Sequence, residues 1–250
     1  GGTVYGPPIA VGGSGLGTAV DSLSVIKQYV YEKKELTFHE LFSIIENDFE
    51  GHDQLRLRFA NNPCCFGNDI EWVDALAARM VNVLSDSVHR LNNDPIDGKF
   101  VTRFFSYTDH VFFGEITPAT PNGRRCGETL SDNMGPTQGK DVNGPTKLLN
   151  SVVKPGPHNY TGAVTCNLKI NPAMVKDENG ITAFKALIKT YLKKGGPQIQ
   201  FNLVDQKILE DAQEHPDKHR DLIVRIAGYC EFFVNLDREL QTEIIRRSVH

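Results

Sequence analysis

The sequence DLIVRIAGY at residues 221–229 predicts a strand that runs from Leu222 to Ala227 and leads directly into Gly228. Its residues are mostly apolar and β-branched, and a glycine follows them, which is typical of a strand that ends in a turn. Strands that alternate with helices are typical of an α/β architecture with parallel strands. This alternation is found upstream, with strands expected at Ala163–Ile170 and Gln198–Val204 and helices at Ile181–Lys193 and Gln206–His215.

The N-terminal part of the chain is predicted to be mainly helical. Apolar residues recur at helical spacing from about Thr18 to Lys33, and again over a longer stretch that starts near Asp69. Between these two stretches, Thr37 and Glu40 have the spacing of a capping box, which predicts that a helix starts at Thr37.

Two further segments are predicted between the N-terminal helices and the strands. Residues 100–113, FVTRFFSYTDHVFF, are dense in β-branched and aromatic side chains and predict a strand. The stretch from Gly114 to Pro157 is rich in glycine and proline, and loops of this length inside a domain usually have a function or are disordered. A closing helix is expected at Arg238–Arg247, with Asp237 as its N-cap.

Composition and charge argue against several classes of function. The 250 residues carry a formal net charge of -4, so no nucleic-acid or membrane-surface partner is indicated. We find neither an apolar run long enough to span a bilayer nor a signal-peptide pattern at the start. The 5 cysteines lack C-x-x-C spacing, which favours reduced thiols over a disulfide framework or a zinc site. We therefore expect a cytoplasmic protein without a bound metal.

One short motif has a nucleotide-binding interpretation. The glycine-rich segment Gly12–Gly17 could form a phosphate-binding loop, but Thr18 occupies the position of the third glycine and no strand clearly precedes the segment. A glycine-rich loop that leads into a helix is the favoured interpretation.

Three pairs of residues have a catalytic or binding interpretation beside a structural one. Each pair is more simply explained by packing or solvation: Cys64 with Cys65 by burial, Arg124 with Arg125 by anchoring of a loop, and His215 with His219 by a solvated turn around Pro216.

The C-terminal segment resembles the glycyl radical signature. Arg225, Ile226, Gly228 and Tyr229 match its pattern of arginine, valine or isoleucine, any residue, glycine, and tyrosine or phenylalanine. The chain thereby resembles the C-terminal portion of a glycyl radical enzyme over essentially its whole length. Other blocks resemble the same family in the same order, namely VDSL at 20–23, FGND at 66–69, ATPNGRRCGE at 119–128, PTQG at 136–139, NGPT at 143–146 and GGPQIQFN at 195–202.

The resemblance implies a fold, a radical site and an activating partner. The fold would be an α/β, ten-stranded barrel, of which this chain would form the C-terminal half with the glycyl radical loop. Residues 1–110 would be the helical and barrel portion of a pyruvate formate-lyase-like domain, and residues 111–250 the C-terminal glycyl radical domain. Gly228 would store the radical, flanked by Arg225 and Tyr229. A separate activating enzyme with S-adenosylmethionine and an iron–sulfur cluster would install it, and the mature enzyme would need no bound cofactor.

The family's second radical residue is not found in this chain. That residue is a thiyl cysteine in a loop well upstream of the glycyl motif, often as Cys-x-Glu, and none of the 5 cysteines matches it. Cys230 is too close to Gly228 in sequence to replace a separate loop. We therefore expect the remainder of the enzyme or a partner subunit to supply the cysteine, this chain alone to be inactive, and the complete enzyme to be a homo-oligomer.

The residues around Gly228 give an indication of the reaction. The runs Ala227–Tyr229 and Phe232–Val234 resemble the diol-dehydratase and choline-lyase branch more than the pyruvate formate-lyase branch. Such enzymes cleave a C–O, C–N, C–S or C–C bond of a small molecule. The segment Arg103–Thr108 resembles a barrel strand that reaches the pocket, so Phe105 and Thr108 are candidate substrate contacts, with barrel packing equally compatible. The alternatives are a formate C-acetyltransferase-type enzyme, a spare-part glycyl radical domain and, from another class, a nucleotide-binding α/β module.

Overall fold

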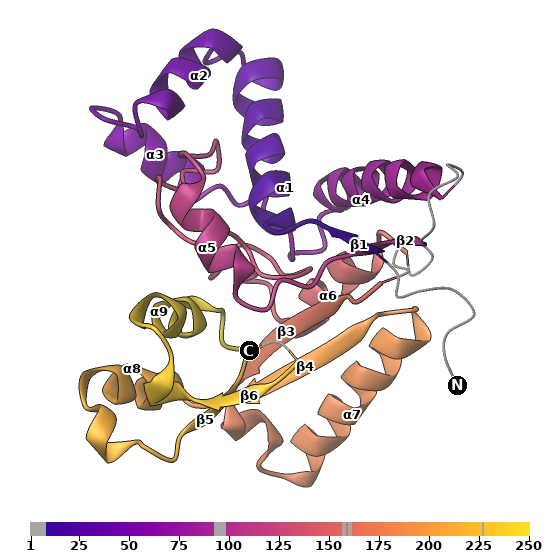
Figure 1. Ribbon diagram of the computed structural model, residues 1–250, viewed down its shortest axis with the longest axis vertical. Helices are drawn as coiled ribbons and strands as arrows, with labels where there is room; N and C mark the ends of the chain where they lie inside the picture. Colours follow the sequence, from indigo (N-terminus) through magenta and orange to yellow (C-terminus); the bar gives the residue numbers. More distant parts are fainter. Residues whose placement is uncertain (1–8, 93–98, 157–158, 160–161, 227) are drawn as a thin grey trace.

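The computed structural model describes residues 9–92, 99–156, 159, 162–226 and 228–250. Helices α1 to α4 lie together in one half of the molecule, and the other half contains strands β3 to β6 with helices α7 to α9 (Figure 1). Among the described residues, none of the helices has the length and hydropathy that a membrane span requires.

The N-terminal half follows the helical pattern of the sequence. Helix α1, Leu16–Val25, continues as a π-helical segment, Ile26–Glu32. The predicted capping box is confirmed, because Thr37 and Glu40 each accept a backbone N–H of the other at the start of α2, Phe38–Glu46. The long amphipathic helix is also confirmed as α4, Glu71–Leu91, and the short helix α3 covers Asp53–Ala60.

The strands form pairs rather than a closed barrel. In parallel pairs, β1 (Ile9–Gly12) lies beside β2 (Phe100–Arg103), and β3 (Thr165–Ile170) lies beside β4 (Gln198–Leu203). The parallel α/β pattern is therefore confirmed for these strands, while β5 (Ile223–Arg225) and β6 (Cys230–Phe232) are antiparallel. The expected half-barrel is not seen within the part of the chain that the structure describes, where each sheet has two strands.

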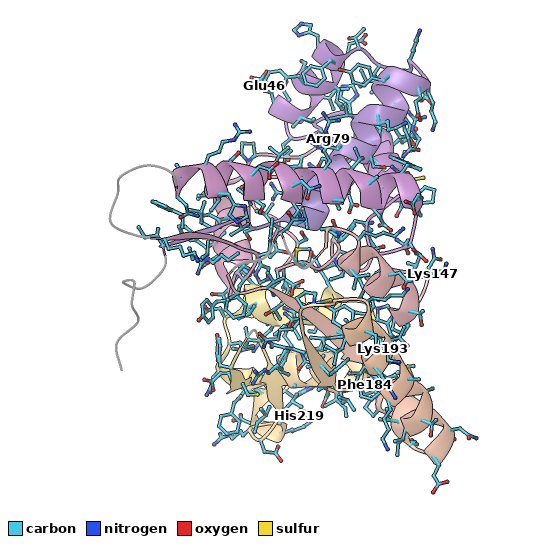
Figure 2. The ribbon with its side chains drawn as sticks, turned by 90° about the vertical axis from the view of Figure 1, so that its right-hand side faces the viewer. Glu46, Arg79, Lys147, Phe184, Lys193 and His219 are labelled. Atoms are coloured by element: carbon cyan, nitrogen blue, oxygen red, sulfur yellow. The ribbon has the colours of Figure 1, made fainter. Side chains whose placement is uncertain are left out.

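Helices cover the strand pairs and complete the core. Helix α7, Glu178–Lys193, packs on β4, with ring centroids of Phe184 and Phe201 4.8 Å apart (Figure 2). Figure 1 also labels three further helices, α6 (Pro145–Val153), α8 (Gln206–Glu214) and α9 (Arg238–Arg246). One core cluster joins α1, α4, α6 and β3, and a second one joins α8, α9 and β5 around the buried Val224, Ile226 and Phe233.

The predicted strand over Phe100–Phe113 is wrong beyond its first four residues. The strand ends at Arg103, residues 104–108 form an isolated bridge and a turn, and α5, Asp109–Ile116, begins after them. The Ser106 N–H donates to the side chain of Asn133 at 2.9 Å, and Tyr107 has a φ of 41°, so the backbone turns out of the extended conformation. Tertiary contacts thus override the local preference for β structure.

Two other expectations need correction. The stretch Gly114–Pro157 contains a helix, α6, which starts with Pro145 in its first turn. Asp237 occupies the N-cap position of α9, but its side chain accepts no hydrogen bond from the helix. The helix is anchored at its other end, where the buried Lys169 ammonium donates to the carbonyls of Ile244 and Ile245 at 3.3 and 2.7 Å.

Candidate functional site

Gly228 lies in the turn between β5 and β6. Its φ of 79° is in the left-handed region, which glycine occupies without a steric penalty. The Ile226 N–H donates to the Tyr229 carbonyl at 3.0 Å and closes the turn. Gly228, Tyr229 and Cys230 are all exposed in this chain. We refer to Ile226, Gly228 and Tyr229 as the Gly228 turn.

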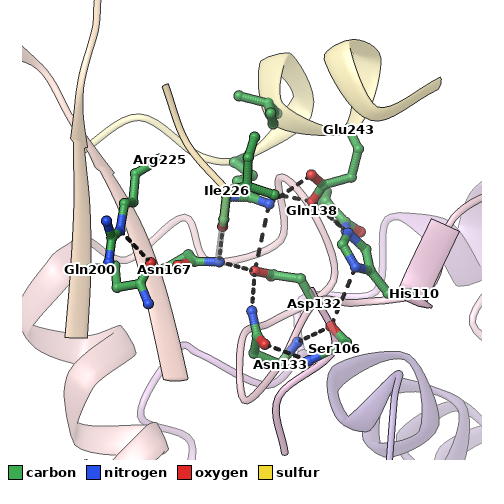
Figure 3. Close-up of polar contacts among 12 residues, drawn as sticks. Ser106, His110, Asp132, Asn133, Gln138, Asn167, Gln200, Arg225, Ile226 and Glu243 are labelled. Atoms are coloured by element: carbon green, nitrogen blue, oxygen red, sulfur yellow. Dashed lines mark hydrogen bonds and ion pairs between the residues drawn. The ribbon is translucent and has the colours of Figure 1, made fainter. Parts of the chain in front are cut away.

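Two amide side chains of β4 hold this turn and the strand before it. The Gln200 Oε1 accepts the Gly228 N–H and the Arg225 Nε–H, both at 3.0 Å. Figure 3 shows the contact between Gln200 and Arg225. Asn202 pairs with the main chain of Arg225 in both directions, accepting its N–H at 2.7 Å and donating to its carbonyl at 2.8 Å. Side chains two residues apart on a strand point to the same face, so Gln200 contacts the Gly228 turn while Asn202 contacts the end of β5 beside it.

A third amide connects the Gly228 turn to the interior. The Asn167 Nδ2 of β3 donates to the Ile226 carbonyl at 3.1 Å and to the Asp132 carboxylate at 2.7 Å (Figure 3). Asp132 also accepts from Asn133 at 3.1 Å, and Asn133 accepts the Ser106 N–H. The segment before α5 is therefore connected to the turn through side-chain amides and one carboxylate.

A buried ionic cluster joins α9 to this network. Arg247 binds Glu243 through two hydrogen bonds of 3.0 and 2.8 Å, and its guanidinium lies 3.7 Å from Asp132. His110 Nε2 lies 3.6 Å from the same Glu243 carboxylate. Burial alone would raise the pKa of Glu243, but the charges of Arg247 and His110 hold that pKa well below its usual range. Glu243 is thus ionised and paired, which fixes α9 against the network.

Aromatic side chains lie on the exposed side of the Gly228 turn. A Cβ built on Gly228 would lie 3.0 Å from Phe105 Cζ, so the predicted pocket residue Phe105 is next to Gly228. The ring centroid of Tyr107 lies 4.5 Å from that of Phe105 and 6.5 Å from that of Tyr229. Thr108 is at the start of α5, where its carbonyl accepts the Val111 N–H at 2.9 Å. The structure thus brings Phe105, Tyr229 and Gly228 together and gives Thr108 a place at a helix end.

The glycines of Gly12–Gly17 serve packing. A strand, β1, does precede them, contrary to the expectation. A Cβ on Gly17 would lie 2.7 Å from the Gly135 carbonyl oxygen, so this glycine is needed where two backbone segments approach. The Thr18 N–H at the start of α1 donates to Ser131 Oγ at 3.1 Å, and this amide is therefore not free for a phosphate. The geometry favours the structural interpretation.

The other paired residues also have structural partners. His215 and His219 both bind the Asp211 carboxylate, at 2.9 and 2.6 Å. Arg124 donates to main-chain carbonyls, including that of Thr117 at 2.8 Å, and so anchors its loop. Burial raises the pKa of the Cys65 thiol well above its usual range. Across the described ranges, we find no cluster of three or more side chains suited to a metal ion.

Sequence reasoning missed the side chains that hold the Gly228 turn. Gln200, Asn202 and Asn167 stood in predicted strands, but nothing assigned them a role, and Asp132 and Glu243 were not singled out. A signal was present for two of them. Gln200 and Asn202 alternate with apolar residues in a strand whose centre is buried, and buried amides require hydrogen-bond partners.

Two protein-family models match this chain, and one of them includes the Gly228 turn. A family model described as pyruvate formate lyase-like matches residues 1–114, and one described as glycine radical matches residues 130–234. Trans-4-hydroxy-L-proline dehydratase of Clostridioides difficile is 36% identical over 236 residues, which are 94% of this chain and 30% of that enzyme. Isethionate sulfite-lyase of Nitratidesulfovibrio vulgaris is 38% identical over 94% of this chain and 28% of that enzyme.

A solved structure shows the same relationship in three dimensions. The glycerol-bound, B12-independent glycerol dehydratase of Clostridium butyricum superposes with a TM-score of 0.91 at 36% identity. The match covers 100% of this chain and 31% of that one, so this chain spans less than a third of the length of this relative. The chain therefore belongs to the glycyl radical enzyme family and matches the C-terminal portion of its dehydratases and lyases.

Proposed function

We propose that this chain is the radical-storing part of a glycyl radical dehydratase or lyase, with the radical on Gly228. The observation that carries the proposal is the Gly228 turn itself. Gly228 combines a left-handed φ of 79°, an exposed position and a hydrogen-bonded amide. A structural turn glycine would need the first property but neither of the other two.

The chemistry requires a glycine at this position. Loss of one hydrogen atom from the Cα leaves an unpaired electron between an amide nitrogen and a carbonyl, and both groups delocalise it. A side chain would crowd the planar radical, and Phe105 already lies within 3.0 Å of the position of a Cβ. A separate activating enzyme, which uses S-adenosylmethionine and an iron–sulfur cluster, would remove the hydrogen atom. Arg225 and Tyr229 would frame the radical.

The stored radical would act through a cysteine outside this chain. In that step the S–H bond of the cysteine breaks, a C–H bond forms on Gly228 and the unpaired electron moves to sulfur. Within the chain, Cys65 and Cys166 are buried, and burial raises the pKa of both thiols. Cys230 is exposed but lies two residues from Gly228 and contacts Arg225 at 3.5 Å. The remainder of the enzyme would supply the thiyl residue.

The substrate would be a small polar molecule. The relatives are named for hydroxyproline, isethionate and glycerol, and their names describe dehydratases and a sulfite-lyase. We accordingly place the reaction among radical cleavages of C–O, C–N, C–S or C–C bonds. Phe105 would contribute to the pocket because it contacts the Gly228 turn, and Thr108 would lie farther along the same segment. The division into residues 1–110 and 111–250 and the homo-oligomeric state stay predictions.

Oxygen-dependent cleavage tests this proposal. After anaerobic activation, exposure of the complete enzyme to air should cut the chain at Gly228 and release the peptide C-terminal to it, which mass spectrometry identifies by its first residues. Gly51→Ala is a matched control, because Gly51 also has a positive φ, 72°, and a Cβ there meets nothing within 4 Å. That variant should be cut, whereas Gly228→Ala should stay intact. Cleavage of Gly228→Ala at the same place would contradict the assignment.

A further inference from the structure

The Gln200 side chain is the group that contacts the Gly228 amide most directly. Gln200 is buried, with 5% of its surface exposed, and its Oε1 accepts both the Gly228 N–H and the Arg225 Nε–H. Two N–H donors at one position require an oxygen there, so the orientation of the carboxamide is fixed. Arg225 thus holds the acceptor in place while the acceptor holds Gly228.

This contact lies on an atom that takes part in delocalising a glycyl radical. The radical is stabilised when the lone pair of the amide nitrogen overlaps with the half-filled orbital of the Cα. An acceptor on the N–H makes the nitrogen a better electron donor, because it increases the electron density on that nitrogen. The same hydrogen bond restrains rotation of the amide, and hence the overlap.

We infer that Gln200 is a positioning residue for the radical, which holds the Gly228 amide and increases the share of unpaired electron on its nitrogen. The inference rests on the proposed function. It assigns a role to Arg225 as well, because the guanidinium fixes the Gln200 oxygen while Asn202 holds the Arg225 main chain at 2.7 and 2.8 Å. Asn202 contacts the Arg225 backbone at the end of β5, and no hydrogen bond joins it to the Gly228 amide. Substitution of Asn202 therefore distinguishes an effect on the strand from an effect on the radical.

The test is electron paramagnetic resonance of the activated, complete enzyme labelled uniformly with nitrogen-15. In Gln200→Leu we expect a smaller nitrogen hyperfine coupling and a larger α-hydrogen splitting than in the wild type, because less of the unpaired spin density lies on the nitrogen and more of it lies on the Cα. The radical should also decay about twofold to tenfold faster under argon, which is the range expected for one lost hydrogen bond. Gln200→Met, which has nearly the same length but only a weak acceptor, should give the same result with less risk to folding.

Two controls make the test specific. Gln200→Glu keeps an acceptor for both N–H groups, so its nitrogen coupling should equal that of the wild type. Asn202→Leu should lower the stability of the fold but leave both couplings of the remaining radical unchanged. Wild-type couplings in Gln200→Leu and Gln200→Met, or equal changes in Asn202→Leu, would overturn the inference. Absence of a radical in the wild-type enzyme, despite an active activating enzyme, would instead refute the proposed function.

Discussion

Gly228 has a backbone conformation that penalises any side chain. A left-handed φ costs an L-residue roughly 1–2 kcal/mol, and the new Cβ would also press on the Phe105 ring. We therefore expect Gly228→Ala to lower the free energy of unfolding of this chain by about 2 kcal/mol and to keep the fold, as measured by urea denaturation. Gly51→Ala has similar backbone strain, but its new Cβ meets no atom within 4 Å, so its free energy of unfolding should fall less than that of Gly228→Ala. An equal or smaller loss of stability in Gly228→Ala would show that the Phe105 ring moves aside without an energetic cost.

The Glu243–Arg247 pair is the buried ionic contact on which α9 depends. Removing one partner of a buried pair leaves an uncompensated charge and typically costs roughly 3–5 kcal/mol. We expect Glu243→Gln to lower the free energy of unfolding by an amount of that order, measured from the urea midpoint. Asp217→Asn, which breaks an exposed pair with Arg220, should have little effect. Similar midpoints for the two variants would contradict the structural role of the cluster.

Helix α1 is connected to the rest of the fold through a buried carboxyl group. Asp21 accepts the Phe66 N–H at 2.8 Å and the Thr137 hydroxyl at 2.5 Å, and burial raises its pKa to about 7 from 3.8. The folded chain therefore holds a proton that the unfolded chain releases between these values. The contribution of Asp21 to the free energy of unfolding is fully present below about pH 3.8 and is lost as the pH rises through about 7.

This linkage predicts a pH dependence that one substitution removes. Between pH 4.5 and about 7, the free energy of unfolding of the wild type should fall relative to that of Asp21→Asn by roughly 1.4 kcal/mol for each pH unit, and it should level off above that range. Chemical denaturation at several pH values measures both chains under the same conditions. Parallel stability curves for the two proteins would mean that Asp21 is ionised in the folded chain.

Helices α2 and α9 differ in whether the side chain at the N-cap position accepts a hydrogen bond from the helix. Thr37 accepts the Glu40 N–H at 3.2 Å, whereas Asp237 accepts none from α9. Thr37→Ala should therefore cost about 1 kcal/mol of stability, and Asp237→Ala clearly less. Thermal or urea unfolding distinguishes the two. A larger loss for Asp237→Ala would show that its side chain caps α9 in solution.

Local signals predicted the elements that depend on local chemistry. The capping box of Thr37 and Glu40 and the apolar stripe of α4 involve residues three or four apart, and both were predicted. The strand over Phe100–Phe113 failed because its second half is bent by Ser106 and Asn133, which are 27 residues apart. Predictions therefore succeeded where contacts between sequence neighbours determine the element, and failed where a contact from a distant part of the chain does.

The same limit applies to the candidate site. Gly228 and Phe105 were predicted from a resemblance, and the structure places the Phe105 ring 3.0 Å from where a Cβ of residue 228 would be. Gln200 and Gly228 are 28 residues apart, and their hydrogen bond follows from the packing of the β5–β6 pair against β4. The Gln138–Glu243 contact, at 3.0 Å, joins residues 105 apart. Single-sequence patterns carry no information about such pairs.

The molecule as a whole exposes an aromatic surface around the Gly228 turn. Tyr107 and Tyr229, whose ring centroids lie 6.5 Å apart, are 49% and 40% exposed, and Phe232 at the end of β6 is 42% exposed. Contiguous exposed apolar surface usually marks an interface. Because the chain spans 28–31% of its relatives' length, we expect the remainder of the enzyme to cover this surface.

Hydrogen exchange tests whether the remainder of the enzyme covers this aromatic surface. Amides of residues 105–112 and 228–232 should exchange more slowly in the complete enzyme than in this chain alone, while amides of α4 should exchange at similar rates in both. Helix α4 serves as the internal control because its apolar face is already packed within this chain. Equal exchange at residues 228–232 in both proteins would place the interface elsewhere.

The most direct test of the central claim is electron paramagnetic resonance after anaerobic incubation of the complete enzyme with its activating enzyme and S-adenosylmethionine. We predict a doublet from one α-hydrogen, which collapses to a single line when the protein is made with α-deuterated glycine. The doublet should persist in Gly51→Ala and be absent in Gly228→Ala. A doublet of normal intensity in Gly228→Ala would contradict the assignment of the stored radical to Gly228.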